Sequence, residues 1–256
     1  MFFSFPRANK GKIDKIYLVR KLPVVYPNGR LEEVYDSICM YRYQDYVLYQ
    51  FPYEYRESNV RVVDSSDDKY GKLIDSNTLA ETRYNYFLVK ENERYGYLSA
   101  EIESKSRKNV IPYPFDFKKW KMVNADSILS IKAGKMNFML VKKLCNLISI
   151  TTDSLTNDRI ELYATKMINS DTDCDSVYLY FSKKLKDIQF SYSDTLDSIT
   201  NMKLFKTRLL YNERYSGEFK IIVPKREFVF AMNRIPVEDY DTVIRFFESF
   251  SKKIKP

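Results

Sequence analysis

The sequence predicts an α+β fold that is predominantly β: antiparallel, strand-rich sheets in a sandwich- or barrel-like arrangement, with a C-terminal amphipathic helix packed on the sheet. Three observations lead to this class. The 22 Tyr and 17 Phe of the chain favour strands, because flat rings pack well on a pleated surface. Many short apolar segments are separated by short polar connections. The last segment, near residues 236–255, has a clear helical period instead.

The composition is that of a globular protein, with 45% hydrophobic and 30% charged residues. A length of 256 residues fits a single domain, 1–256, and leaves open a division into two β-rich lobes of about 1–120 and 121–256. No stretch approaches the roughly 20 apolar residues that a membrane-spanning helix needs, so no membrane span is expected.

The first quarter of the chain is expected to be strands. Ile13–Val19 is the first strand, and Pro27–Gly29 is a turn, because Asn and Gly tolerate positive φ. Ile38–Tyr43 and Tyr46–Phe51 then form a tyrosine-rich pair of strands around Gln44–Asp45. Together these segments predict two consecutive hairpins.

The next segments alternate between predicted strands and breaks. Asn59–Val63 is a short strand, and Asp64–Gly71 is a polar loop. Ser76–Thr82 is expected to form a short helix. Tyr84–Lys90 and Arg94–Ala100 then predict a hairpin.

The middle of the chain is less regular. Two prolines in Val110–Asp116 prevent a regular helix or a central strand there. Three further strands are expected at Ile128–Lys132, Asn137–Lys143 and Leu147–Thr151, while Arg159–Ile168 is ambiguous between strand and helix.

The last third carries the clearest strand patterns. Val177–Phe181 is a continuous apolar run, as in a strand covered on both faces. Ile188, Phe190 and Tyr192 alternate with polar residues, which predicts a half-buried strand. The pattern continues, with connections short enough for antiparallel neighbours, through Met202–Tyr211, Phe219–Val223 and Phe228–Met232.

The C-terminal helix is expected over Pro236–Lys255. Pro236 suits a first turn, where a missing N–H costs nothing. Glu238 and Asp239 place negative charge at the positive end of the helix dipole, and lysines place positive charge at the other end. One apolar stripe, expected to cover a face of the sheet, comprises Tyr240, Val243, Ile244, Phe247, Phe250 and Ile254.

The chain has no histidine, which excludes Ser–His–Asp and Cys–His catalysis and His-ligated zinc or iron. Cys39, Cys145 and Cys174 are odd in number and far apart, so we interpret them as buried thiols in a reducing compartment. This favours a cytoplasmic location. An extracytoplasmic one applies if the N-terminus is the remnant of a signal peptide cleaved near Ala8.

The net charge of +8 favours anionic partners. Basic and aromatic side chains that interleave can bind phosphates and stack on bases. The candidate nucleic-acid site of this kind comprises Lys118, Lys119, Trp120 and Lys121. The alternating carboxylates of Asp171–Asp175 lack the glycine and the final glutamate of a calcium loop, and we interpret them as a solvated loop without a metal.

Three functional hypotheses follow. The lack of any catalytic or cofactor-binding motif, beside a large aromatic body, favours a non-catalytic binding or assembly protein that acts through protein–protein contacts and needs no cofactor. The alternative is nucleic-acid binding through a basic–aromatic surface. The third is a histidine-free enzyme that works with carboxylates, Lys, Tyr, Ser or Cys. The sequence does not predict an oligomeric state.

Overall fold

The computed structural model describes residues 12–63, 72–99, 120–133, 139–166, 168, 173–218 and 220–254. The strands within these ranges are β1 (Ile13–Val25), β2 (Leu31–Tyr43), β3 (Tyr46–Val63), β4 (Lys72–Lys90), β5 (Tyr95–Ser99), β6 (Trp120–Asn124), β7 (Cys145–Thr152), β8 (Arg159–Thr165), β9 (Ser176–Ser182), β10 (Lys203–Tyr211), β11 (Arg214–Ser216), β12 (Ile221–Val223) and β13 (Arg226–Ile235). The helices are α1 (Ala125–Ala133), α2 (Met139–Leu144), α3 (Asp194–Thr200) and α4 (Tyr240–Ile254).

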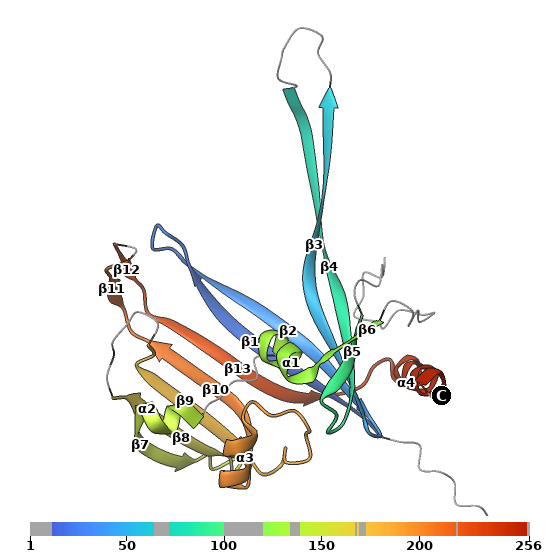
Figure 1. Ribbon diagram of the computed structural model, residues 1–256. Coiled ribbons are helices and arrows are strands. Elements are labelled where there is room, and N and C mark those ends of the chain that lie inside the picture. The colour runs from blue at the N-terminus through green and yellow to red at the C-terminus, as the bar shows by residue number, and fades with distance from the viewer. Residues whose placement is uncertain are drawn as a thin grey trace, which may run out of the picture.

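Eleven of these strands form one antiparallel sheet in the order β6-β5-β4-β3-β2-β1-β13-β10-β9-β8-β7, and β11 and β12 form a separate pair. The predicted class is confirmed: the chain is mostly β, with a C-terminal helix packed on a large antiparallel sheet (Figure 1). One detail differs. The sheet is open, with β6 and β7 at its edges, in place of the sandwich- or barrel-like closure that we expected.

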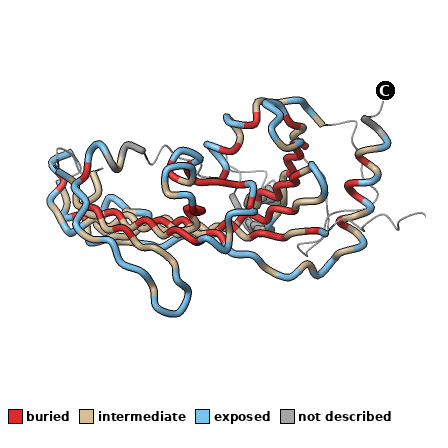
Figure 2. The backbone as a smooth tube through the Cα atoms, turned by 90° about the horizontal axis from the view of Figure 1, so that it is seen from below, coloured by how far each residue is buried: buried red, intermediate tan, exposed pale blue. Residues whose placement is uncertain are grey.

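Apolar side chains cover both faces of the sheet. On the first face, alternate residues of the central strands, such as Leu18, Met40 and Leu179, meet α1, α3 and the segment before α3 in one core. Buried residues accordingly run along the middle strands and beneath these helical segments, whereas the peripheral loops are exposed (Figure 2). The first face therefore holds the main core.

The second face is covered at one end by α4. Val243, Phe246, Phe247 and Phe250 are buried there against side chains of β1 to β4, which include Ile13, Cys39, Tyr41, Leu48, Tyr86 and Leu88. Tyr240 and Ile244 pack at the margin of this core, as predicted for the apolar stripe, while the buried Phe246 lies outside the predicted set.

The helix α4 begins at Tyr240, four residues after the predicted start at Pro236. Its first intrahelical bond runs from Val243 N–H to the carbonyl oxygen of Asp239, at 3.1 Å. Pro236 to Asp239 thus lead into the helix from β13, and the acidic residues lie at the N-terminal end where the helix dipole favours them.

Two predicted strands are helices. The strand expected at Ile128–Lys132 lies within α1, because the Asn124 side chain accepts a hydrogen bond from Ser127 N–H at 3.0 Å and so caps a helix. The strand expected at Asn137–Lys143 overlaps α2, and residues 134–138 lie outside the described residues. The ambiguous segment that starts at Arg159 is strand β8.

Two other predictions also fail for identifiable reasons. The expected helix Ser76–Thr82 is part of β4, where every residue pairs with β3. The segment with Ile188, Phe190 and Tyr192 buries these three side chains in the first core without forming a strand. The Tyr192 hydroxyl instead donates a hydrogen bond to the Ala231 carbonyl oxygen at 3.0 Å. Every second side chain of this segment is therefore buried, although its backbone joins no strand ladder.

Gly96 in β5 lies directly beneath an aromatic ring of β4. A Cβ atom at this position would lie 2.5 Å from Phe87 Cζ and 2.7 Å from the Leu88 carbonyl oxygen. The glycine therefore allows the buried Phe87 ring to close over the β4–β5 ladder.

We predict that Gly96→Ala destabilises the protein by about 1–3 kcal/mol, because the added methyl group overpacks a site closed by a ring and by backbone. The matched control is Gly217→Ala, since nothing lies within 4 Å of a Cβ atom there. Urea unfolding followed by far-UV circular dichroism measures both. Equal midpoints for the two variants would contradict the role assigned to Gly96.

Candidate functional site

The candidate site lies where the large sheet splits. β2 and β3 are paired only from Tyr43–Tyr46 to Cys39–Gln50. Beyond this point Leu31–Ile38 stays paired with β1, and Phe51–Val63 stays paired with β4. The two hairpins diverge from there, as Figure 1 shows. We call the gap between Leu31–Ile38 and Phe51–Val63 the fork.

A proline explains where the β2–β3 ladder stops. In a hairpin with a two-residue turn such as Gln44–Asp45, the flanking pair is hydrogen-bonded and bonded pairs recur at every second position. Cys39–Gln50 is such a pair, and the next would be Ser37–Pro52. Pro52 has no N–H to donate, so the ladder ends one step before it.

A second proline, Pro23, ends the pairing of the β1–β2 hairpin with β13 on its other side. The ladder between β1 and β13 ends at Lys21–Val229, although both strands continue. The next bonded pair would join Pro23 to Glu227, and Pro23 again lacks the donor. The outer part of the β1–β2 hairpin therefore leaves the sheet on both sides.

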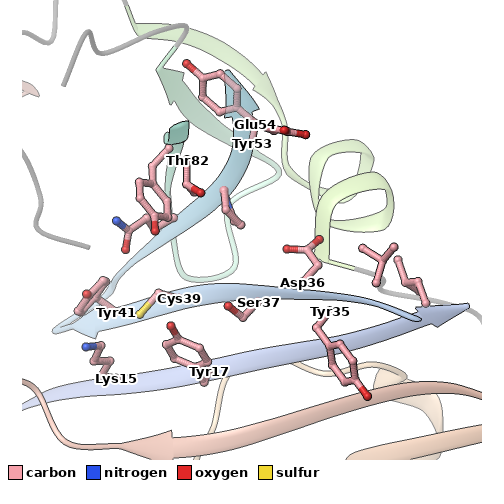
Figure 3. A pocket seen from close by; sticks show the side chains of 15 residues that line it. Lys15, Tyr17, Tyr35, Asp36, Ser37, Cys39, Tyr41, Tyr53, Glu54 and Thr82 are labelled. Carbon is pink, nitrogen blue, oxygen red and sulfur yellow. The ribbon is translucent and has the colours of Figure 1, made fainter. Parts of the chain in front are cut away.

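The fork opens into a cavity of about 450 Å³, which falls within the roughly 300–1,000 Å³ usual for small-molecule sites. Figure 3 shows its side chains, which come from β1, β2, β3 and β4. The lining residues are Lys15, Tyr17, Leu22, Val34, Tyr35, Asp36, Ser37, Cys39, Tyr41, Gln50, Pro52, Tyr53, Glu54, Thr82 and Tyr84.

Buried polar side chains form one end of the cavity. Lys15 is 9% exposed, and its Nζ lies 5.6 Å from the centroid of the Tyr41 ring. Cys39 lies beside them at 7% exposure (Figure 3). Gln50, at 1% exposure, points its Nε2 to the Tyr86 hydroxyl at 3.4 Å. This end of the cavity adjoins the core beneath α4.

The acidic side chains nearby are exposed or paired. Asp36 forms an ion pair with Arg20, and Glu54 is exposed. Glu238, which precedes α4, is also exposed and acts weakly on the Cys39 thiol. Among the described residues, no carboxylate therefore forms an ion pair with the ammonium group of Lys15.

Burial controls protonation at this end of the cavity. It raises the pKa of the Cys39 thiol above its ordinary value, and the hydrogen bond with Tyr41 offsets only part of this. Burial also raises the pKa of the Tyr41, Tyr84 and Tyr86 hydroxyls. These groups are neutral at pH 7, a state that suits hydrogen bonding and makes Cys39 a poor nucleophile.

A second surface of interest lies on β9 and β10. The Lys206 Nζ lies 5.0 Å from the Tyr180 ring centroid, and the Arg208 Cζ lies 5.3 Å from the Tyr178 ring centroid. The two rings stack at 6.5 Å. The register places all four side chains on one face of the sheet. We call this group the tyrosine–cation ladder.

The structure describes two of the four residues predicted to bind nucleic acid. Lys118 and Lys119 lie outside the described residues. Trp120 begins β6, and its ring centroid lies 5.9 Å from that of Phe246 and 6.2 Å from that of Phe250 in α4. Lys121 is exposed. One side of the Trp120 ring is thus engaged by the C-terminal helix.

The acidic motif at Asp171–Asp175 is described only from Asp173 onward. Asp175 Oδ2 lies 2.5 Å from Arg214 Nη2 and accepts the Asn212 N–H at 2.6 Å. This carboxylate therefore fixes the connection between β10 and β11. No cluster of three metal-ligating side chains occurs in the part of the chain that the structure describes.

No protein-family model and no curated protein matches the chain. Among the described helices, none is long and apolar enough to cross a membrane. Function is therefore inferred from the fork, its cavity and the tyrosine–cation ladder.

We predict that Pro52→Val extends the β2–β3 ladder, because residue 52 regains its N–H. Asp36 and Tyr53 would then form the next non-bonded pair, whose Cα atoms lie about 4.5 Å apart. A cross-strand nuclear Overhauser effect between their Hα atoms is the expected signal. Pro27→Val, which changes a turn outside the fork, is the control.

If Pro52→Val folds but shows no nuclear Overhauser effect between residues 36 and 53, the missing N–H of Pro52 is not what opens the fork. Strand twist would then explain why the hairpins diverge.

Proposed function

We propose that the chain is a non-catalytic assembly protein that joins copies of itself through the β3–β4 hairpin. The observation that carries the proposal is the length of this hairpin beyond the sheet. β3 has 18 residues and β4 has 19, and they pair with each other as far as Val63–Lys72. Figure 1 shows the outer half projecting away from the body.

In the part of the chain that the structure describes, the projecting ribbon has two strands and no third. β5 pairs with β4 only from Phe87 to Val89, and β2 pairs with β3 only as far as Gln50. Within the described residues, the ribbon from Glu54–Thr82 outward thus has two unpaired edges. An isolated two-stranded hairpin is marginally stable in water, and unpaired edges readily accept another strand. A protein partner that covers the ribbon supplies what it lacks.

Charge favours a second copy as that partner. The sequence segment 54–82, of which residues 64–71 lie outside the described residues, contains seven acidic and four basic residues, a net charge of −3. The whole chain carries +8, so the remaining residues carry +11. An acidic ribbon and a basic body on the same chain attract each other between copies. The tyrosine–cation ladder offers a basic surface on the body.

The ribbon can be shortened without disturbing the fork. Tyr55 pairs with Glu81, and by the alternation of bonded pairs their N–H and C=O groups face each other. Replacing residues 56–80 with Asn-Gly therefore closes the ribbon with a two-residue turn. The body keeps both cores and the cavity.

We predict that the sedimentation coefficient of the full chain rises with concentration, whereas that of the shortened variant stays at the monomer value. Sedimentation velocity over the micromolar range measures this, and added salt lowers the association because surface charges are screened. Far-UV circular dichroism and the urea midpoint verify that the shortened body is folded. A full chain that stays monomeric, or a folded short variant that associates equally, would overturn the proposal.

A second candidate function is the binding of single-stranded nucleic acid, favoured by the tyrosine–cation ladder. Its rings are half-buried and its two cations lie over them on adjacent strands. Arg208 also pairs with Glu227, which leaves Lys206 as the cation that is not in an ion pair with a described carboxylate. Aromatic rings stack on bases and cations bind phosphates.

If this second function holds, Lys206→Glu lowers the affinity for a single-stranded oligonucleotide and reduces the salt slope by about one. Fluorescence polarisation at low salt measures both. Lys225→Glu, an equal charge change at an exposed loop position, is the control, and Lys121→Glu tests the segment predicted from sequence. Absence of binding at low salt would eliminate the candidate.

A further inference from the structure

The cavity in the fork contains a cation without a counter-ion among the described residues. Lys15 is 9% exposed and lines the cavity, and no described carboxylate forms an ion pair with it. Transferring a charged group from water into a protein interior is unfavourable unless an opposite charge or hydrogen bonds compensate it. The Tyr41 ring supplies only a cation–π contact, at 5.6 Å.

Another lysine of the same strand, Lys21, has the carboxylate partners that Lys15 lacks among the described residues. Lys21 lies on the same face of β1, and its Nζ lies 2.6 Å from Glu33 Oε1 and 3.7 Å from Glu227 Oε2. Lys15 occupies the more buried position, and no described carboxylate forms an ion pair with it. A buried cation that faces a cavity is the arrangement expected where the anion comes from a ligand.

We propose that the fork cavity binds a small organic carboxylate with a flat apolar body, and that Lys15 pairs with its carboxylate group. Lys15 is the one basic residue among those that line the cavity in the described part of the chain. A single positive charge matches a singly charged ligand. Phosphate carries more charge and requires more donors.

The aromatic part of the lining fits the apolar body of such a ligand, and the carboxylates of Asp36, paired with Arg20, and of Glu54 also line the cavity. The rings of Tyr17, Tyr41 and Tyr84 line the cavity together with Cys39. Rings of this kind prefer offset-stacked or edge-to-face contacts with another flat ring. Ser37 and Thr82 also line the cavity and offer hydroxyl groups, which fix orientation.

The site is independent of the proposed assembly, because the shortened ribbon leaves every residue of the cavity in place. Binding of a carboxylate and self-association are therefore measured separately, and either can fail without the other.

The test uses sodium benzoate, phenylacetate and 4-hydroxybenzoate as probes, with benzamide as a neutral analogue and inorganic phosphate as a second anion. Amide shifts in the ¹⁵N–¹H spectrum of the full chain report binding. We expect at least one carboxylate to shift residues 15, 39, 41 and 50 at millimolar concentrations, and benzamide and phosphate to bind about tenfold more weakly or not at all.

Two variants assign the effect to one side chain. Lys15→Met keeps the unbranched, flexible shape of the side chain, shortens it by one atom and removes its charge, and we expect the affinity for the carboxylate to fall about tenfold or more. Lys21→Met, on the same strand and face, should bind like the native chain. The melting temperature of each variant verifies that it is folded.

A measurement on the native chain guards against misfolding of Lys15→Met. Cys39 lines the cavity at 7% exposure, so a bound carboxylate shields its thiol. We expect the carboxylate probe that shifts the amides of residues 15, 39, 41 and 50, and not benzamide, to slow the labelling of Cys39 by iodoacetamide, which peptide mass spectrometry measures. Equal binding to Lys15→Met, preference for phosphate, or no effect of any carboxylate on these residues and on Cys39 labelling would each overturn the proposal.

Discussion

The missing backbone donor at Pro52 sets the point at which the large sheet divides into two hairpins. A continuous ladder between β2 and β3 would place Ser37 opposite Pro52 and extend the sheet along both strands. Without that N–H the ladder stops at Cys39–Gln50, and the two hairpins follow their own twist. The fork, its cavity and the projecting ribbon all begin at this residue. Pro23 has the corresponding effect on the β13 side of the β1–β2 hairpin.

The two hydrophobic cores hold the base of the fork together. α4 packs across β1 to β4 on the paired side of the fork, and the main core fills the opposite face of the sheet. The base of the fork is thus covered on both faces, while the strands beyond it have edges that pair with no other described strand. Such edges promote association between chains and are usually short or protected in soluble proteins. Edges of this length are the reason for the assembly role that we propose, in which a partner covers them.

Much of the fold was predictable from sequence, because burial leaves a clear period in strands and helices. The tyrosine-rich β2–β3 pair and the apolar stripe of α4 were both identified in this way. The failures arose where another effect outweighs the pattern. Asn124 caps α1 in a segment that reads as a strand, and the residues around Phe190 alternate without joining a ladder.

The candidate site was not predictable in the same way. Lys15 and Cys39 are unremarkable in sequence, and only pairing of their strands brings them together with Tyr41. One signal was available: Pro52 directly follows the predicted strand that ends at Phe51, and a proline there marks the end of pairing on one edge. The direction in which the freed strands then run depends on tertiary contacts.

Residue-resolved hydrogen exchange of the native chain distinguishes a β2–β3 ladder that stops before Pro52 from a continuous one. In β2 the amides of Cys39 and Tyr41 face β3 within the ladder, whereas those of Ser37 and Tyr35 face the fork. If the ladder stops at Cys39–Gln50, the first two amides exchange slowly and the second two exchange fast, and the amides of Ile38 and Asp36, bonded toward β1, are protected. Protection of Ser37 and Tyr35 equal to that of Cys39 would contradict this end point of the ladder.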